Sequence, residues 1–311
     1  MVVSARILTF PSIGEMVMRQ SPGSAGRWGD VQFHLDEIQN PDYVIVIDHL
    51  ERDTVVECRV DNIWCVIHEP PVDMFKWLHD AAPQYGKVFT TDPDRTDPQY
   101  VRMHTSIPWE LGKSYDFLKN CAVPEKVKDL SWVTSNKGFM EGHKLRLRFL
   151  DNVRHEIEFD LWGTGFEHID DKWDGIAPYR YSMAIENYNG PFYWSEKLGD
   201  CFLGYAMPIY YGCTRIADFF PEESFIGIDI TKPAEAIEII NDAIGSKRWE
   251  RNFDAVVHAR ELVLDGYQFM PHFAKLIGAN EALNGAGETA VVTLPAYDHL
   301  KRPALPIHMF N

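Results

Sequence analysis

The feature that most constrains the fold is a series of short, wholly apolar runs that end abruptly in polar residues. Tyr43–Ile47 reads YVIVI and ends at Asp48, and Ile63–Ile67 reads IWCVI and ends at His68. Apolar runs of this length without alternation are typical of strands buried on both faces, as in parallel sheets. Because helices must then cover both faces of the sheet, the pattern predicts an α/β fold.

The same pattern recurs along the chain in two successive series. The first has further expected strands at 6–10, 31–35, 87–91 and 101–105, and a helical stretch at 73–81. The second has expected strands at 130–134, 157–161, 181–185, 208–211 and 225–230, helices at 196–205 and 233–244, and one or two long helices over 249–277. The segment 143–154 alternates as a strand would, but its apolar residues also recur at helical spacing, and a helix is favoured. Alternation on this scale implies parallel sheets with right-handed crossovers. We therefore predict two Rossmann-like domains, 1–125 and 126–285, joined through 122–129 and followed by a tail at 286–311.

Charge and composition narrow the classes of function. The 311 residues include 30 basic and 46 acidic ones, a formal net charge of −16. Nucleic-acid binders usually present a basic face, so no nucleic-acid partner is expected, although a local basic pocket for a small phosphate ligand remains compatible.

Location is inferred from what the sequence lacks. No apolar run approaches the roughly 20 residues of a membrane span, and the first residues lack the pattern of a signal peptide. The five cysteines form no CxxC pair, which fits free thiols in a reducing compartment. We expect a cytoplasmic protein without a transmembrane segment, with peripheral membrane contact left open.

Common phosphate and metal motifs are absent or incomplete. Gly163-Thr164-Gly165 lacks the third glycine of a dinucleotide-binding fingerprint and is expected to form a tight turn. Asp92 and Asp94 flank Pro93 after an expected strand, where an Asp-x-Asp pair can hold Mg²⁺ or Mn²⁺ against a diphosphate. Because proline and aspartate also form turns, a solvated loop is favoured.

The most informative stretch is the loop and helix after the third strand of the second series. The strand ends at Glu186 and Asn187, and the helix opens with Ser195, Glu196 and Lys197. Ligands of open α/β sheets bind at the carboxyl ends of strands. With Ser195 as N-cap, the free N–H groups of this helix would favour a diphosphate, beside the Lys197 cation and a Glu196 acceptor for sugar hydroxyls. The alternative is an ordinary cap with a solvated first turn.

This stretch resembles the donor-binding motif of the α1,3/4-fucosyltransferases, glycosyltransferase family 10. That family carries Glu-Asn at a strand end, then Tyr-x-Thr-Glu-Lys, Pro-Ile-Tyr-x-Gly, Phe-x-Pro and Ser-Phe-Ile. The matching segments here are Glu186-Asn187, Tyr193-Trp194-Ser195-Glu196-Lys197, Pro208-Ile209-Tyr210-Tyr211-Gly212, Phe220-Pro221 and Ser224-Phe225-Ile226. Several pieces in the right order form a specific signal. Ser195 replaces the usual threonine but keeps the hydroxyl.

Weaker resemblance continues upstream. Ser135 and Asn136 end an expected strand and resemble the family's Val-Val-Ser-Asn segment. Arg146 opens a match to its Arg-x-x-Phe helix, whose arginine contacts the donor diphosphate. The resemblance carries that role to Arg146, with Lys144 and Arg148 close enough to compete for it.

The candidates for the general base come from the N-terminal half of the chain. In the N-terminal half, the segment from His68 to Pro71 resembles the one that carries the family's catalytic glutamate, which implies Glu69 as the base. Glu69 also follows an expected strand directly, where a group that deprotonates an acceptor hydroxyl is expected. His68 ranks second, and Asp48, at the end of the preceding strand, ranks third.

Taken as a whole, the resemblance implies a GT-B fold, with two Rossmann-like domains whose parallel sheets face each other across a cleft. The N-terminal domain would bind a glycan acceptor and the C-terminal domain GDP-fucose. The reaction would be inverting fucosyl transfer, α1,3 on a GlcNAc- or Glc-type acceptor. The implied donor-binding residues are Ser135, Asn136, Arg146, Glu186, Asn187, Tyr193, Ser195, Glu196 and Lys197.

No cofactor would be obligatory, and stimulation by Mn²⁺ or Mg²⁺ is left open. The alternatives are a GT-B transferase with another nucleotide sugar and a non-catalytic module that binds nucleotide sugars or glycans.

Overall fold

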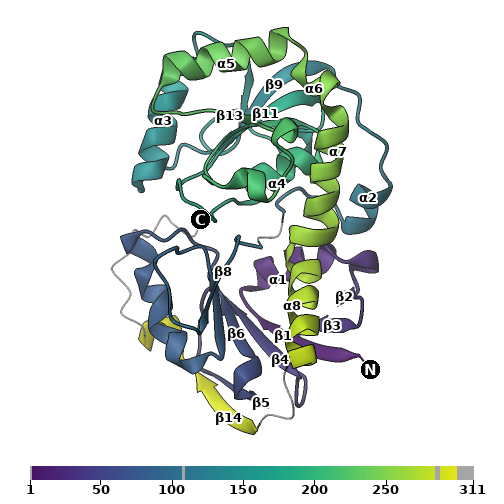
Figure 1. The fold of residues 1–311 in the computed structure, drawn as a ribbon, viewed down its shortest axis with the longest axis vertical. Helices are drawn as coiled ribbons and strands as arrows, with labels where there is room; N and C mark the ends of the chain where they lie inside the picture. The colour runs from purple at the N-terminus through teal and green to yellow at the C-terminus, as the bar shows by residue number, and fades with distance from the viewer. Residues whose placement is uncertain (1, 107–108, 284–287, 300–311) are drawn as a thin grey trace. The chain divides into compact units, whose positions relative to one another are not determined.

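A computed structural model describes residues 2–106, 109–283 and 288–299. It divides into two compact units (Figure 1): unit 1 is Met1–Ser106 with Phe269–Asn311, and unit 2 is Ile107–Gln268. These boundaries differ from the predicted 1–125, 126–285 and 286–311. The expected linker 122–129 lies inside unit 2, because Lys126 Nζ donates to the carbonyls of Ala177 and Gly204 at 2.8 Å each.

Unit 1 is built on a seven-stranded sheet with the order β2-β3-β1-β4-β6-β7-β8. Its strands are β1 (Val3–Leu8), β2 (Arg27–Trp28), β3 (Val31–His34), β4 (Tyr43–Ile47), β6 (Ile63–Val66), β7 (Lys87–Thr90) and β8 (Tyr100–Arg102). Every neighbouring pair is parallel except β2 with β3. The runs YVIVI and IWCVI form the central strands β4 and β6, buried on both faces as predicted.

The helices of unit 1 come from distant parts of the chain. They are α1 (Pro11–Arg19), the 3₁₀ segment Asp73–Gln84 and α8 (Phe269–Leu283). The sheet core packs against α8 through Phe269 and Phe273. An antiparallel ribbon of β5 (Thr54–Arg59) and β14 (Thr289–Leu294), which the sequence analysis missed, completes the unit.

Unit 2 has a five-stranded, wholly parallel sheet with the order β10-β9-β11-β12-β13. Its strands are β9 (Lys128–Val133), β10 (Asp160–Trp162), β11 (Tyr179–Ile185), β12 (Met207–Tyr211) and β13 (Ile226–Gly227). In chain order this is 2-1-3-4-5, a doubly wound arrangement whose strand order reverses between β9 and β11. In open α/β sheets, ligands bind at the carboxyl ends of the strands where the order reverses, which points to the ends of β9 and β11.

The helices of unit 2 include three that the sequence predicted. They are α2 (Tyr115–Asn120), α3 (Glu141–Val153), α4 (Glu196–Leu203), α5 (Pro233–Gly245), α6 (Arg248–Arg251) and α7 (Phe253–Leu262). The predictions for α3, α4 and α5 are confirmed. The one or two long helices expected over 249–277 are instead several shorter elements. The breaks are at Asn252, at a π-helical segment (Val263–Tyr267) and at Gln268, where ψ is 164°.

Helix α3 is the element whose sequence best explains the position of the site. Its buried face carries Phe149, Leu150 and Val153 in the second half, which belong to the apolar core. In the first half the same face carries His143 and Arg146, which are also buried. Because buried polar groups need partners, this change from apolar to polar marks the first turn of α3 as part of a polar site.

Candidate functional site

The predicted donor residues meet at the point where the strand order of unit 2 reverses. Ser135 and Asn136 follow β9, and Glu186 and Asn187 follow its neighbour β11. The first turn of α3 packs closely against this edge: a Cβ at Gly142 would lie 1.8 Å from the carbonyl oxygen of Asn187. Glycine is therefore required at this position for helix and strand end to approach.

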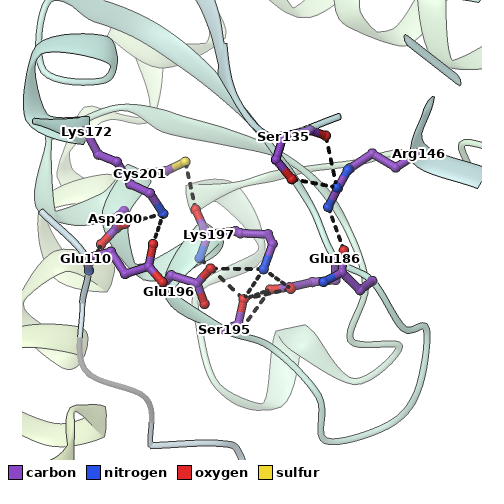
Figure 2. Close-up of polar contacts among 11 residues, drawn as sticks. Glu110, Ser135, Arg146, Lys172, Glu186, Ser195, Glu196, Lys197, Asp200 and Cys201 are labelled. Atoms are coloured by element: carbon purple, nitrogen blue, oxygen red, sulfur yellow. Dashed lines mark hydrogen bonds and ion pairs between the residues drawn. The ribbon is translucent and has the colours of Figure 1, made fainter. Parts of the chain in front are cut away.

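Arg146 joins the two strand ends (Figure 2). Its Nη1 donates to Asn187 Oδ1 at 2.6 Å, and its Nη2 donates to the carbonyl oxygen of Ser135 at 3.2 Å. Burial lowers the pKa of Arg146, while Glu186 and Glu196 oppose that shift. The competing candidates Lys144 and Arg148 are exposed on α3, and Lys144 pairs with Glu141 at 2.6 Å. The geometry therefore favours Arg146 as the buried cation.

Glu186 is almost completely buried and holds the start of α4. Its Oε1 accepts the backbone N–H of Ser195 at 2.7 Å, and its Oε2 accepts the Ser195 hydroxyl at 2.7 Å. Lys197 Nζ lies 3.5 Å from Oε2. Burial raises the pKa of Glu186, and Lys197 opposes this rise. The structure thus gives Glu186, predicted as a donor ligand, a positioning role toward Ser195 and Lys197.

Lys197 and Glu196 form the next part of the same network (Figure 2). Lys197 Nζ lies 3.0 Å from Glu196 Oε1 and 3.1 Å from Ser195 Oγ. Burial disfavours ionisation of both groups, but their mutual attraction outweighs it. This attraction lowers the pKa of Glu196 to about 2 and raises the pKa of Lys197 above its ordinary value. Both side chains are largely buried, so a solvated first turn is wrong, whereas Ser195 is the predicted N-cap.

Three further charged residues, one of them in α4 itself, extend this network, and the sequence analysis missed them. Lys172 pairs with Glu110 and lies 3.6 Å from Asp200 Oδ2. Burial raises the pKa of Asp200 to about 7 against the pull of Lys172. Asp200 stands four residues after Glu196, so helical spacing could have placed it on the same side of α4. No sequence signal links it to Lys172 or Glu110.

The loop between β11 and α4 is held from the other side by the loop after β12. Thr214 N–H donates to the carbonyl of Gly190 at 3.0 Å, and the Arg215 guanidinium lies over the Phe192 ring at 5.5 Å. Tyr193, predicted to bind the donor, is buried at the end of this loop and packs edge-on against Tyr188. These contacts fix the loop that precedes Ser195.

The segment from Gly163 to Gly165, predicted as a tight turn, lies beside the end of β9. Gly163 and Gly165 have φ values of 112° and 85°, which favour glycine. Asn136 N–H donates to the carbonyl of Thr164 at 3.0 Å, and a Cβ at Gly165 would lie 2.2 Å from the Asn136 side chain. The turn therefore positions Asn136.

The candidate bases lie in unit 1 at the carboxyl ends of the neighbouring strands β4 and β6. Asp48 has a left-handed φ of 57°, and its Oδ1 accepts the backbone N–H of His68 at 2.6 Å. Its Oδ2 lies 3.8 Å from His68 Nδ1. Asp48 therefore holds the turn that carries His68 and Glu69. Glu69 is half-buried and His68 buried.

Asp92 is occupied within its own loop. Its Oδ1 accepts the backbone N–H of Asp94 at 3.0 Å, and its Oδ2 pairs with Arg95 at 3.2 Å. Contacts of this kind are typical of a turn, the interpretation favoured from the sequence over a metal site. Among residues 2–106, 109–283 and 288–299, no group of three or more His, Cys, Asp or Glu side chains is arranged to hold a metal ion. Within the same residues, no helix has the length and apolar character needed to cross a membrane.

Comparisons with known proteins agree with this geometry. Residues 123–243 match the model of "Glycosyltransferase family 10 (fucosyltransferase) C-term". Over 126 residues the chain is 28% identical to the human 4-galactosyl-N-acetylglucosaminide 3-alpha-L-fucosyltransferase 9. The matched region covers 39% of this chain and 34% of that protein. Over 74 residues the chain is 30% identical to the alpha-(1,3)-fucosyltransferase FucT of Helicobacter pylori, covering 24% and 16%. The chain thus matches about a third or less of each relative's length.

One solved structure extends the likeness to the fold of nearly the whole chain. A crystal structure of an alpha1,3-fucosyltransferase with GDP-fucose superimposes with a TM-score of 0.52 at 15% identity, and covers 92% of this chain and 91% of that one. The fold is that of the GT-B glycosyltransferases, two Rossmann-like units with parallel sheets. The predicted resemblance to glycosyltransferase family 10 is confirmed, and it is carried by residues 123–243, which match the model of the family's C-terminal part.

Proposed function

We propose that this protein transfers fucose from GDP-fucose to a hydroxyl of a glycan acceptor, with inversion and in α1,3 linkage to a GlcNAc- or Glc-type sugar. The supporting observation is that two cations, the buried Arg146 and the largely buried Lys197, lie beside the strand reversal of unit 2 within the family match. Cations fixed in a low-dielectric site stabilise phosphate charge more strongly than cations in water.

The proposed reaction is a single displacement. Glu69 takes the proton of the acceptor hydroxyl while its oxygen attacks the anomeric carbon of fucose. The bond from that carbon to the phosphate oxygen breaks, and GDP leaves with the electron pair. Arg146 and Lys197 stabilise the charge that grows on the diphosphate.

A panel of nucleotide sugars tests this function. The protein is incubated with GDP-fucose, GDP-mannose, UDP-galactose and UDP-GlcNAc, and both hydrolysis and transfer to glycan acceptors are measured. Selective turnover of GDP-fucose supports the proposal. Turnover of a different donor favours another GT-B transferase, and binding without turnover favours a non-catalytic module.

The first prediction concerns the leaving group. Lys197→Ala should lower kcat/KM for GDP-fucose at least tenfold, because a charge-assisted hydrogen bond to phosphate contributes roughly 1.5–3 kcal/mol. Lys144→Ala is the matched control, since Lys144 is exposed on α3. Circular dichroism establishes that both variants are folded. Unchanged kinetics in folded Lys197→Ala would remove this cation from the site.

A second prediction concerns metal. Because Arg146 and Lys197 are both available for the diphosphate, EDTA should leave substantial transfer activity, measured as GDP release. Asp92→Ala and Asp94→Ala should also remain active, because Asp92 already binds Asp94 and Arg95. If chelation abolishes transfer, Mn²⁺ restores it and these two substitutions also abolish it, an Asp-Pro-Asp metal site replaces our proposal.

A further inference from the structure

The first turn of α3 has unused hydrogen-bonding capacity. The N-cap residue, Met140, supplies no side-chain hydrogen bond to the helix. The first backbone N–H groups of a helix have no partner within the helix and form the positive end of its dipole. At α4, by contrast, Glu186 and the Ser195 hydroxyl already serve this purpose. Of these two helix N-termini beside the strand reversal, α3 is therefore the one whose backbone N–H groups remain available to bind an anion.

A side chain in this turn supplies independent evidence. His143 is only 4% exposed, yet its Nδ1 has no hydrogen-bond partner among the residues that the structure describes. Its ring packs edge-on against Phe139, with centroids 4.4 Å apart. Buried polar atoms are nearly always satisfied, so an unpartnered one needs an explanation such as a ligand.

Arg146, one turn further along α3, also has a buried nitrogen without a hydrogen-bond partner. Its Nη1 and Nη2 bind Asn187 and Ser135, but its Nε is buried and has no partner within the described part of the chain. His143 and Arg146 are three residues apart and therefore lie on one face of the helix. Two unsatisfied polar atoms on one buried face indicate a missing acceptor near both.

The charges around His143 indicate what that acceptor is. Burial, followed by Arg146, Lys197 and Lys137, lowers the pKa of His143 to about 4. The imidazole is therefore neutral near pH 7 and carries one N–H among these three cations. Such a surrounding repels a cation and attracts an anion.

We propose that His143 is a further ligand of the nucleoside diphosphate, with its Nδ1–H and the Arg146 Nε–H donating to phosphate oxygens at the N-terminus of α3. This inference rests on the proposed function, which supplies the diphosphate. It places the phosphates at α3, where the sequence analysis had placed them at the first turn of α4. Lys197 then reaches them from α4.

Displacement of a fluorescent GDP analogue tests the inference on the whole chain. Unlabelled GDP, UDP and guanosine compete for the site of the wild type and of His143→Leu, His143→Asn and His155→Leu. His143→Leu should weaken GDP binding about tenfold or more and leave guanosine binding unchanged. Asparagine can place an amide N–H near the Nδ1 position, so His143→Asn should retain most of the GDP affinity. His155 is exposed beyond the end of α3 and is the matched control.

The possible failures are distinguishable. Equal GDP affinity in wild type and His143→Leu would overturn the inference and leave the proposed function intact. An equal loss for guanosine and GDP would also overturn it, because the residue would then not act on the phosphates. If the wild type binds UDP and not GDP, the proposed donor is wrong, and the same variants test His143 with UDP. If it binds neither, both proposals fail.

Discussion

Replacing Glu69 by glutamine should reduce kcat for fucosyl transfer at least a hundredfold and leave the affinity for GDP unchanged. General-base catalysis typically contributes about 10²–10⁴-fold, and glutamine preserves the shape of the side chain but cannot take the proton. Glu69 belongs to unit 1, whereas the proposed phosphate ligands belong to unit 2. Steady-state rates at saturating donor, together with calorimetric GDP binding, measure the two quantities separately.

Asp48→Asn is the matched control for this experiment. The asparagine carbonyl can still accept the His68 backbone N–H that Asp48 accepts at 2.6 Å, so the turn should persist and the rate should fall little. A large loss in Asp48→Asn or in His68→Gln, with a small loss in Glu69→Gln, would transfer the role of base to that residue. Near-normal turnover in Glu69→Gln would end the assignment of Glu69.

Most strands of the two sheets could be predicted from local sequence, whereas the short strand β2 was not expected and β13 is shorter than the expected strand 225–230. YVIVI and IWCVI can be buried only as central strands, and they occupy β4 and β6 almost residue for residue. Likewise, Pro233 at the first position of α5 and the apolar spacing along α3 specify those helices without distant contacts. The pattern of apolar and polar residues predicts a helix or a strand wherever that pattern can be buried in only one way.

Long-range pairings could not be predicted in the same way. The strand β5 reads TVVECR and pairs with β14, more than two hundred residues away, so no local signal reveals the ribbon. The return of α8 to unit 1 depends on contacts of the same kind, such as those from Asn280 to Tyr43 and Lys87. Such pairs decide which unit a segment joins, and they appear only once the chain is folded.

In the candidate site, too, neighbours in the sequence could be predicted and long-range contacts could not. The motif at residues 193–197 placed Ser195, Glu196 and Lys197 together because they are consecutive. The sequence did not show that Glu186 binds Ser195 through both of its oxygens, nor that Lys172 lies close to Asp200 of α4. Residue types alone identify charged groups; whether a charge faces ligand or supports a neighbour is decided by burial.

Because Glu186 holds the start of α4, its removal should lower the stability of unit 2. Glu186→Leu should destabilise unit 2 by about 3–5 kcal/mol, the range found when one partner of a buried ion pair is removed. The substitution leaves the Ser195 N–H and hydroxyl without their acceptor and deprives Lys197 of one of its two carboxylates. Urea unfolding followed by tryptophan fluorescence, with amide exchange at α4, measures the loss.

Two companion variants separate charge from shape in this experiment. Glu186→Gln retains a carbonyl that can accept from Ser195, so its loss should be smaller than that of Glu186→Leu. The double variant Glu186→Leu with Lys197→Met removes both members of the pair and should recover part of the stability, because no cation is then left short of its carboxylate. If Glu186→Leu alone is as stable as the wild type, the carboxylate does not hold α4, and Glu186 becomes available again as a direct ligand of the donor sugar.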